Sequence, residues 1–165
     1  MNNDSALPQN QILVGERLYA EAINVILENA QNELLIFDQD LSHGDFASTQ
    51  KYALLQQFLS RNVVSRLTFI LQNAASFHEK YPRLFNLLGI YGHKMAVYET
   101  NDSVKHAKDC FILADGKHYI KRIHIDQARF KYALNDADSV EILHSRFEEL
   151  LEATQGMIAV TKLGL

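Results

Sequence analysis

The strongest structural signal in this chain is a predicted β-hairpin within residues 105–127, KHAKDCFILADGKHYIKRIHIDQ. An apolar run at residues 110–114 precedes Asp115-Gly116, and a second strand-like run follows at residues 117–125. Asp-Gly between two such runs is typical of a tight hairpin turn, because both residues tolerate the positive φ angles that the turn requires. The fold must therefore accommodate antiparallel strands in the second half of the chain.

Before the hairpin, helical and strand-like patterns alternate. Three segments have apolar residues at helical spacing: residues 14–31, 49–61 and 77–91. Three short apolar runs lack that period and are predicted strands: residues 33–37, 66–71 and 94–99. A last helix is predicted at residues 138–153 and an edge strand at residues 157–161. Because strands separated by helices pair in parallel, we predict an α/β fold: a mixed β-sheet flanked by helices, in the order α-β-α-β-α-β-β-β-α.

The length and the charge distribution limit the kind of partner. The 165 residues suit one domain, which we place at residues 12–165 after a flexible polar tail at residues 1–11. The net charge is −4, yet residues 105–131 contain seven Lys and Arg against three Asp, a local charge of +4. The remaining residues contain nine Lys and Arg against seventeen Asp and Glu, a charge of −8. A basic region on an acidic chain favours a small anionic ligand and disfavours nucleic acid as a partner.

Cysteine content and hydropathy exclude other classes. The one cysteine, Cys110, allows neither an internal disulfide nor a cysteine-based zinc site. No apolar run reaches the roughly 18 residues that a membrane span needs. The segment MNNDSALPQNQ has neither the basic nor the apolar part of a signal peptide. We therefore expect a cytoplasmic protein without membrane contact.

Three segments resemble parts of a known superfamily. NELLIFDQDL resembles a first strand and its following loop, KDCFILADG a strand and turn, and SRFEELLEA a closing helix. Together with the order of elements, they make residues 14–153 similar to one half of the phospholipase D superfamily, and closest to an uncharacterised bacterial group with this fold. Active sites in that superfamily resemble a construction from two such halves, related by a twofold axis. The resemblance therefore implies a homodimer for a chain with one half.

The catalytic motif of that superfamily, His-x-Lys-(x)4-Asp, is not intact here. With Asp115 as its aspartate, the histidine and lysine positions are occupied by Lys108 and Cys110. His106-Ala107-Lys108 has the His-x-Lys spacing, but six residues separate Lys108 from Asp115. The Gly-Ser-x-Asn segment that usually follows falls on residues 122–125, which read Arg-Ile-His-Ile. The resemblance thus implies a relative that has lost phosphodiester chemistry. In the alternative, a two-residue strand slip makes His106, Lys108 and Asp115 catalytic.

The return strand of the hairpin supplies a candidate anion site. Strict alternation places His118, Arg122 and His124 on one face and Tyr119, Lys121 and Ile123 on the other. We predict that Lys108, His118, Arg122 and His124 bind an anion, with Arg122 gripping phosphate or carboxylate through two hydrogen bonds. The same pattern also fits an exposed edge strand that its charges keep soluble.

Three aspartates follow the first predicted strand: Asp38, Asp40 and Asp45. Their oxygens suit Mg²⁺, and FDQDL resembles the first motif of phosphatases of the haloacid dehalogenase type. That family needs a distant acidic pair and a longer chain, so we read the segment as a polar loop and expect neither a metal nor a cofactor.

These observations favour a non-catalytic phospholipase D-like domain that binds a small anionic ligand or a partner. One alternative is a phosphodiesterase or nuclease that uses the displaced His-x-Lys pair. The other is a structural domain for protein interaction.

Overall fold

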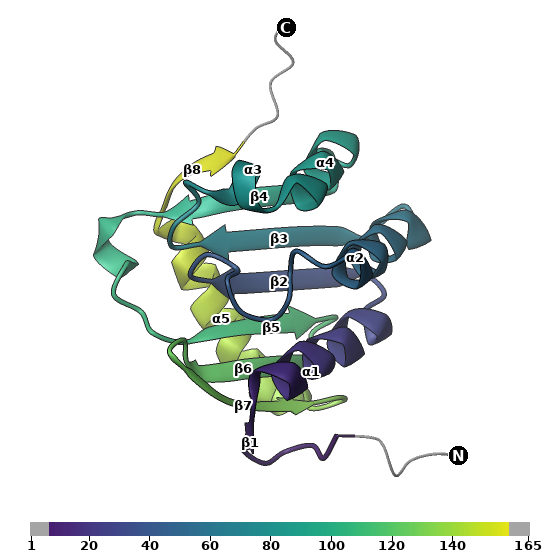
Figure 1. Ribbon diagram of the computed structural model, residues 1–165, viewed down its shortest axis with the longest axis vertical. Helices are drawn as coiled ribbons and strands as arrows, with labels where there is room; N and C mark the ends of the chain where they lie inside the picture. Colours follow the sequence, from purple (N-terminus) through teal and green to yellow (C-terminus); the bar gives the residue numbers. More distant parts are fainter. Residues whose placement is uncertain (1–6, 159–165) are drawn as a thin grey trace, which may run out of the picture.

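A computed structural model describes residues 7–158. These residues form an eight-stranded mixed sheet in the order β1-β7-β6-β5-β2-β3-β4-β8, with helices on both faces (Figure 1). The strands are β1 Leu13–Val14, β2 Glu33–Asp38, β3 Arg66–Leu71, β4 Met95–Thr100, β5 Cys110–Ala114, β6 His118–His124, β7 Gln127–Ala133 and β8 Thr154–Ile158. The helices are α1 Glu16–Asn29, α2 Thr49–Arg61, α3 Phe77–Lys80, α4 Pro82–Ile90 and α5 Ala137–Glu152, with a 3₁₀ turn at Asp102–Val104.

The predicted mixed α/β architecture is confirmed. Strands β2, β3 and β4 pair in parallel, and β5 joins β2 in antiparallel orientation. In β2 every side chain from Leu34 to Asp38 is buried, because helices cover both faces of the sheet. That burial explains the continuous apolar run in the sequence. Among the described residues no helix is long and apolar enough to cross a membrane.

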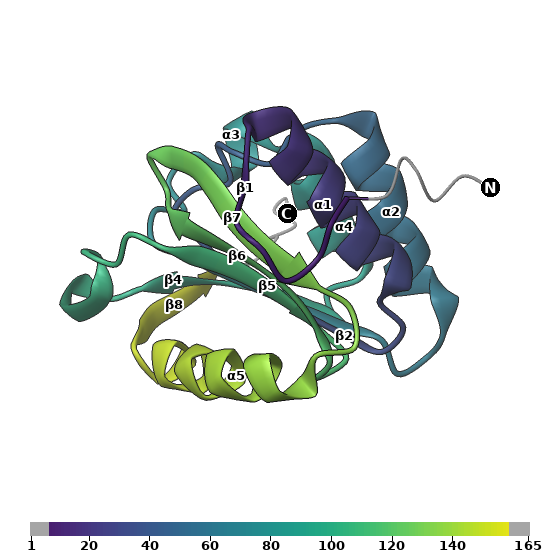
Figure 2. The ribbon, with the colours of Figure 1, turned by 90° about the horizontal axis from the view of Figure 1, so that it is seen from below.

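The two faces of the sheet carry separate cores. Helices α1, α2 and α4 cover one face, whereas α5 alone covers the other (Figure 2). The larger core includes Ile36, Phe58 and Phe69, and the smaller core joins Phe37 and Phe111 to Phe147 of α5. Because α5 is a single helix, part of the β6–β7 surface on its side remains uncovered.

Two helix predictions can be compared at residue level. Helix α2 has the predicted bounds, and Ser48 caps it by accepting a hydrogen bond of 3.1 Å from the Lys51 N–H. The predicted helix at residues 77–91 is instead divided into α3 and α4. The break falls at Tyr81, which has φ −128° and ψ 59°. It precedes Pro82, whose ring disfavours the helical conformation in the preceding residue.

The predicted hairpin is confirmed. Strands β5 and β6 pair from Cys110↔Arg122 to Ala114↔His118. Asp115 and Gly116 have φ values of 58° and 70°, and the Lys117 N–H donates to the Ala114 carbonyl at 3.0 Å. Both central residues thus have the positive φ of a type I′ turn.

Strands β1 and β7 are absent from the sequence prediction, which left residues 127–137 without structure. β7 pairs with β6 and β1 pairs with β7. The edge strand predicted at residues 157–161 lies partly outside the described residues, and β8 begins earlier, at Thr154. Of the predicted tail, residues 1–6 lie outside the described range. The Asn10 N–H donates to the Tyr132 carbonyl at 3.0 Å, so residues just before β1 contact β7.

Candidate functional site

The three candidate catalytic residues lie at opposite ends of β5. His106 and Lys108 are exposed and precede the strand, whereas Asp115 follows it in the hairpin turn. Within the described strand, β5 pairs regularly with β2 and β6 from Phe111 to Ala114, so no slip brings His106 into the sheet. The structure therefore brings His106 and Lys108 close in the chain but does not join them to Asp115.

The Asp115 carboxylate is occupied by the main chain. It accepts hydrogen bonds from the N–H groups of Gln31, Asn32 and Glu33 at 2.8, 2.7 and 2.9 Å. These three donors immediately precede or begin β2, next to β5 in the sheet. Asp115 thus fixes the hairpin turn to the start of β2.

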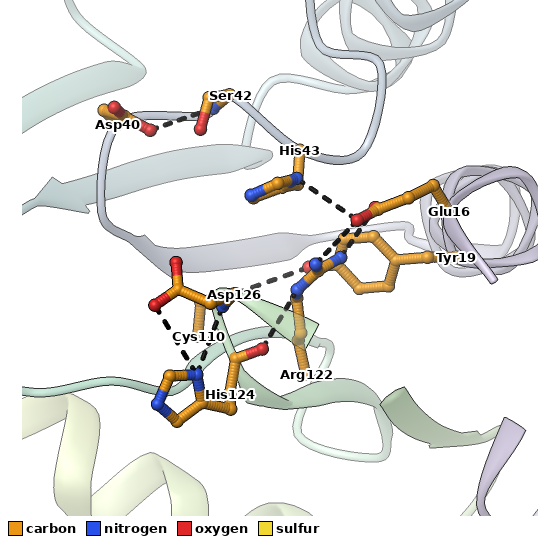
Figure 3. Close-up of polar contacts among 9 residues, drawn as sticks. All are labelled: Glu16, Tyr19, Asp40, Ser42, His43, Cys110, Arg122, His124 and Asp126. Atoms are coloured by element: carbon orange, nitrogen blue, oxygen red, sulfur yellow. Dashed lines mark hydrogen bonds and ion pairs between the residues drawn. The ribbon is translucent and has the colours of Figure 1, made fainter. Parts of the chain in front are cut away.

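The position where the superfamily has its motif lysine holds a buried thiol. Cys110 is 2% exposed, and its Sγ lies 3.4 Å from the Tyr19 hydroxyl of α1 (Figure 3). Burial raises the pKa of both Cys110 and Tyr19 well above their usual values, with a contribution from the nearby Asp38. The thiol is therefore protonated and shielded, which is the opposite of what nucleophilic chemistry requires.

Beside Cys110, Arg122 forms a bidentate ion pair with Glu16. The guanidinium is fully buried, and its NH1 and NH2 donate to the two Glu16 oxygens at 2.8 Å each (Figure 3). Its Nε donates to the His124 carbonyl at 3.3 Å, and its carbon lies 4.9 Å from the centre of the Tyr19 ring. The hydrogen bond from Arg122 lowers the pKa of Glu16. Arg122 therefore uses its donors inside the protein.

The remaining two residues of the predicted anion site lie apart. His118 is 4% exposed, and its Nδ1 accepts a hydrogen bond of 3.0 Å from the Asn135 N–H. Burial lowers the pKa of His118, which favours the neutral ring. His124 lies at the other end of β6, beside Asp126, after an irregular pairing between Arg122 and His124. Arg122 and His124 are thus in contact, whereas Lys108 and His118 are elsewhere.

On the opposite face, a groove of about 620 Å³ runs between α5 and the strands β6 and β7. Four cationic side chains line it: Lys108, Lys121, Lys131 and Arg146. The one carboxylate in its lining is Asp109, which pairs with Arg146 at 2.7 Å and with Lys121 at 3.9 Å. A hollow of about 400 Å³ adjoins this groove, shares Lys108, Asp109 and Arg146 with it, and is also lined by His106.

Two of these lysines face each other directly. Lys121 of β6 and Lys131 of β7 are register partners in the antiparallel sheet. Like charges in such a pair repel and destabilise the sheet. Strict alternation predicts Lys121 on the face opposite the expected anion site, and it does not reveal Lys131, because β7 is absent from the predicted elements. The alternation of Phe130 and Tyr132 with Arg129 and Lys131 was the signal that could have revealed it.

The aspartates that follow β2 do not converge. Asp38 is buried, Asp40 accepts a hydrogen bond of 3.1 Å from the Ser42 N–H, and Asp45 has a φ of 63° in the loop. Among residues 7–158, no group of three or more His, Cys, Asp or Glu side chains is arranged to hold a metal ion. Burial raises the pKa of Asp38 to about 7.

The fold is that of phospholipase D-like proteins. The chain superimposes on Nuc from Salmonella typhimurium, a phospholipase D family member, with a TM-score of 0.65 and 9% identity over 91% of this chain and 99% of that one. NucT from Helicobacter pylori superimposes with a TM-score of 0.63 and 12% identity, over 90% of this chain and 98% of NucT. TrmBL2, an archaeal chromatin protein whose structure shows a mode of DNA binding, superimposes with a TM-score of 0.67 and 14% identity. This chain is covered to 92% but spans only 56% of TrmBL2.

The sequence places the chain more narrowly. It belongs to the family described as Domain of unknown function (DUF7931), which matches residues 16–162. No curated protein matches it in sequence.

Proposed function

We propose that this protein is a non-catalytic phospholipase D-like domain that binds a small anion in the groove between α5 and strands β6 and β7. The observation that carries the proposal is the facing pair Lys121 and Lys131. Lys131 has no ion-pair partner among the described residues, and Lys121 has only Asp109 at 3.9 Å. An anion between the two ammonium groups would remove their repulsion and gain two charge-assisted hydrogen bonds.

The closed cluster around Cys110 supports the non-catalytic part of the proposal. A phosphate ligand there would have to replace Glu16 at the Arg122 guanidinium, and Cys110 supplies no charge to hold it. The Asp115 carboxylate already accepts hydrogen bonds from three main-chain donors. Two of the three motif positions, Cys110 and Asp115, thus have structural contacts that compete with catalysis.

The charge around the groove favours a small anion over a polyanion. Five acidic residues lie on α5: Asp138, Glu141, Glu148, Glu149 and Glu152. A nucleic acid long enough to follow the groove would meet this helix, and the repulsion would oppose the attraction of the four cations. TrmBL2 shares the fold, but DNA binding by this chain is disfavoured on this ground.

Inorganic phosphate is the simplest probe of the site. We expect it to shift the amide NMR signals of β6 and β7, with the shifts lost in the double variant Lys121→Gln/Lys131→Gln. Lys80→Gln, an exposed lysine on α3, is the matched control and should bind as the wild type does. Shifts that persist in the double variant, or their absence from the wild type, would refute the proposed site.

A second candidate function rests on one observation: His106 and Lys108 both line the smaller hollow, together with Glu149. Such a site could act on a phosphodiester with His106 as the nucleophile. Hydrolysis of bis(p-nitrophenyl) phosphate with and without Mg²⁺ separates the two functions. We expect no turnover above that of His106→Ala and Lys108→Ala. Metal-free turnover that both substitutions abolish would make the protein an enzyme with a displaced motif.

The proposal includes a homodimer, as the phospholipase D-like fold implies. Strand β8 is an edge of the sheet that pairs with β4 on one side only within the described chain, and Met157 is 58% exposed on it. Light scattering coupled to size exclusion measures the mass directly. A monomer at micromolar concentration would remove the dimer from the proposal without affecting the anion site.

A further inference from the structure

We infer that the anion bound in the groove carries an apolar group: an alkyl or aryl phosphate or carboxylate rather than a bare ion. This inference rests on the proposed function, since it specifies the ligand of the same groove.

The apolar side chains of the groove carry the inference. Ile12, Ile123 and Ile142 line it and remain 45%, 40% and 73% exposed. Single exposed isoleucines are common on protein surfaces. Here, however, three of them come from three separate segments and converge on one groove that also contains four cations. Convergence of apolar and cationic groups is typical of a site that binds a ligand with both characters.

The facing lysines and the most exposed isoleucine lie on opposite sides of the groove, although Ile123 is on β6 with Lys121 and Arg146 is on α5 with Ile142. The facing lysines lie on β6 and β7, whereas Ile142 and Leu143 lie on α5, across the groove. A head group between Lys121 and Lys131 therefore leaves the remainder of a ligand facing the apolar side chains of α5. The volume of about 620 Å³ lies within the usual range of small-molecule sites and exceeds what a phosphate ion fills.

The test compares hexyl phosphate and phenyl phosphate with inorganic phosphate and hexanol, by calorimetry or NMR titration. We expect hexyl phosphate to bind at least about tenfold more tightly than phosphate, which corresponds to burial of about two methylene groups. Hexanol lacks the charge and should not bind measurably. Ile142→Asn should abolish the advantage of hexyl phosphate over inorganic phosphate.

Ile90→Asn is the matched control, because Ile90 is a 54% exposed isoleucine at the end of α4, outside the groove. Both variants replace exposed side chains, and circular dichroism verifies that they are folded. Equal affinities for phosphate and hexyl phosphate would overturn this inference and leave the anion site intact. Failure of both ligands to bind would refute the proposed function itself.

The same chemistry occurs in a free metabolite-sized anion and in a lipid head group with its chain. Sedimentation with vesicles of phosphatidylcholine and phosphatidic acid distinguishes these sources. If the protein binds hexyl phosphate and also sediments with the vesicles, the ligand is a lipid head group with its chain. If it binds hexyl phosphate but does not sediment with the vesicles, the ligand is a free anion. Sedimentation that Ile142→Asn and Lys121→Gln/Lys131→Gln leave unchanged, without hexyl phosphate binding, contradicts the inference.

Discussion

Arg122 and Glu16 are 106 residues apart in the chain and form two parallel hydrogen bonds of 2.8 Å. The pair connects the start of α1 to the middle of β6, and it lies beside the thiol that occupies the motif lysine position. Next to the position that corresponds to the superfamily's motif lysine, this chain thus has a structural contact between two elements. This relationship leads to the first prediction.

Glu16→Gln should lower the free energy of unfolding by about 1–2 kcal/mol, because it leaves the buried Arg122 cation without a charged partner. The effect stays moderate because the Glu16 side chain is 54% exposed and water screens the pair. Since Arg122 lowers the folded-state pKa of Glu16 below 4.5, the wild type should lose this stabilisation as the pH falls below about 4.5. Urea unfolding of both proteins from pH 3 to 7 measures the difference in unfolding free energy and its pH dependence.

Arg17→Gln is the control for that measurement, because Arg17 pairs with Glu21 on the surface of α1 and is 81% exposed. It should change stability by less than about 0.5 kcal/mol. A Glu16→Gln protein as stable as the wild type at pH 7 would contradict the structural role of the pair.

Asp38→Asn should stabilise the protein at pH 8 and do so by a smaller amount at pH 5. Burial raises the folded-state pKa of Asp38 to about 7, above its ordinary value of 3.8. The folded protein therefore binds a proton that the unfolded chain releases, and stability falls as the pH rises from about 4 to 7. At roughly 1.4 kcal/mol for each pH unit, the full loss approaches about 4 kcal/mol.

Urea unfolding at pH 5 and pH 8 measures both proteins. Asp102→Asn replaces an exposed aspartate and should follow the wild-type curve. If Asp38→Asn has the same pH dependence as the wild type, Asp38 is ionised at neutral pH and its burial is tolerated by other means.

Asp115→Gly should cost about 1–2 kcal/mol of unfolding free energy, because three main-chain donors lose a charged acceptor. Glycine accepts the φ of 58° without strain, so the loss combines the missing hydrogen bonds with the greater backbone entropy of glycine in the unfolded chain. Asp115→Asn keeps one carbonyl oxygen and should show about half the effect. Urea unfolding of the two variants gives the comparison, and equal stabilities would show that the carboxylate contributes nothing.

Lys131→Gln should raise the unfolding free energy by about 0.5 kcal/mol while it weakens phosphate binding. Removing one charge of the Lys121↔Lys131 pair relieves the repulsion between strands. Thermal unfolding with and without phosphate measures both effects, because a ligand that binds the folded state raises its stability. Lys80→Gln should show neither effect. A destabilised Lys131→Gln protein would indicate that Lys131 contributes packing instead of charge.

The sequence predicted those elements that depend on local pattern. The hairpin was predicted because Asp115-Gly116 determines the turn by its backbone preference alone. The bounds of α2 followed from apolar spacing. β7 was missed because its turn at Ile125 and Asp126 has no glycine, proline or asparagine.

The candidate site depended on tertiary structure and was less accessible to prediction. Strict alternation assigned Arg122 and His124 to a binding face, but the pairing of β6 with β7 is irregular between them and Glu16 of α1 occupies the Arg122 guanidinium. The partner Glu16 lies near the start of the chain, and no local pattern links it to β6. Likewise, Lys121 acquires its significance from Lys131 on a strand that was not predicted. Charge content located the basic region, but contacts between distant segments determined which face could bind.

The last prediction is that the His-x-Lys-(x)4-Asp motif cannot be installed by substituting residues 108 and 110. Lys108→His should leave the fold unchanged, because Lys108 is exposed. Cys110→Lys should destabilise the protein by about 3 kcal/mol, because it places a second cation and a longer side chain in the core beside Arg122, a cost that the nearby Asp38 carboxyl offsets only in part. Cys110→Ser keeps a small hydroxyl within reach of Tyr19 and is the milder control. Soluble yield and urea unfolding distinguish the three variants. If the double variant Lys108→His/Cys110→Lys folds and hydrolyses a phosphodiester without metal, the Arg122–Glu16 pair does not exclude the substrate, and phosphodiester hydrolysis is accessible to this fold.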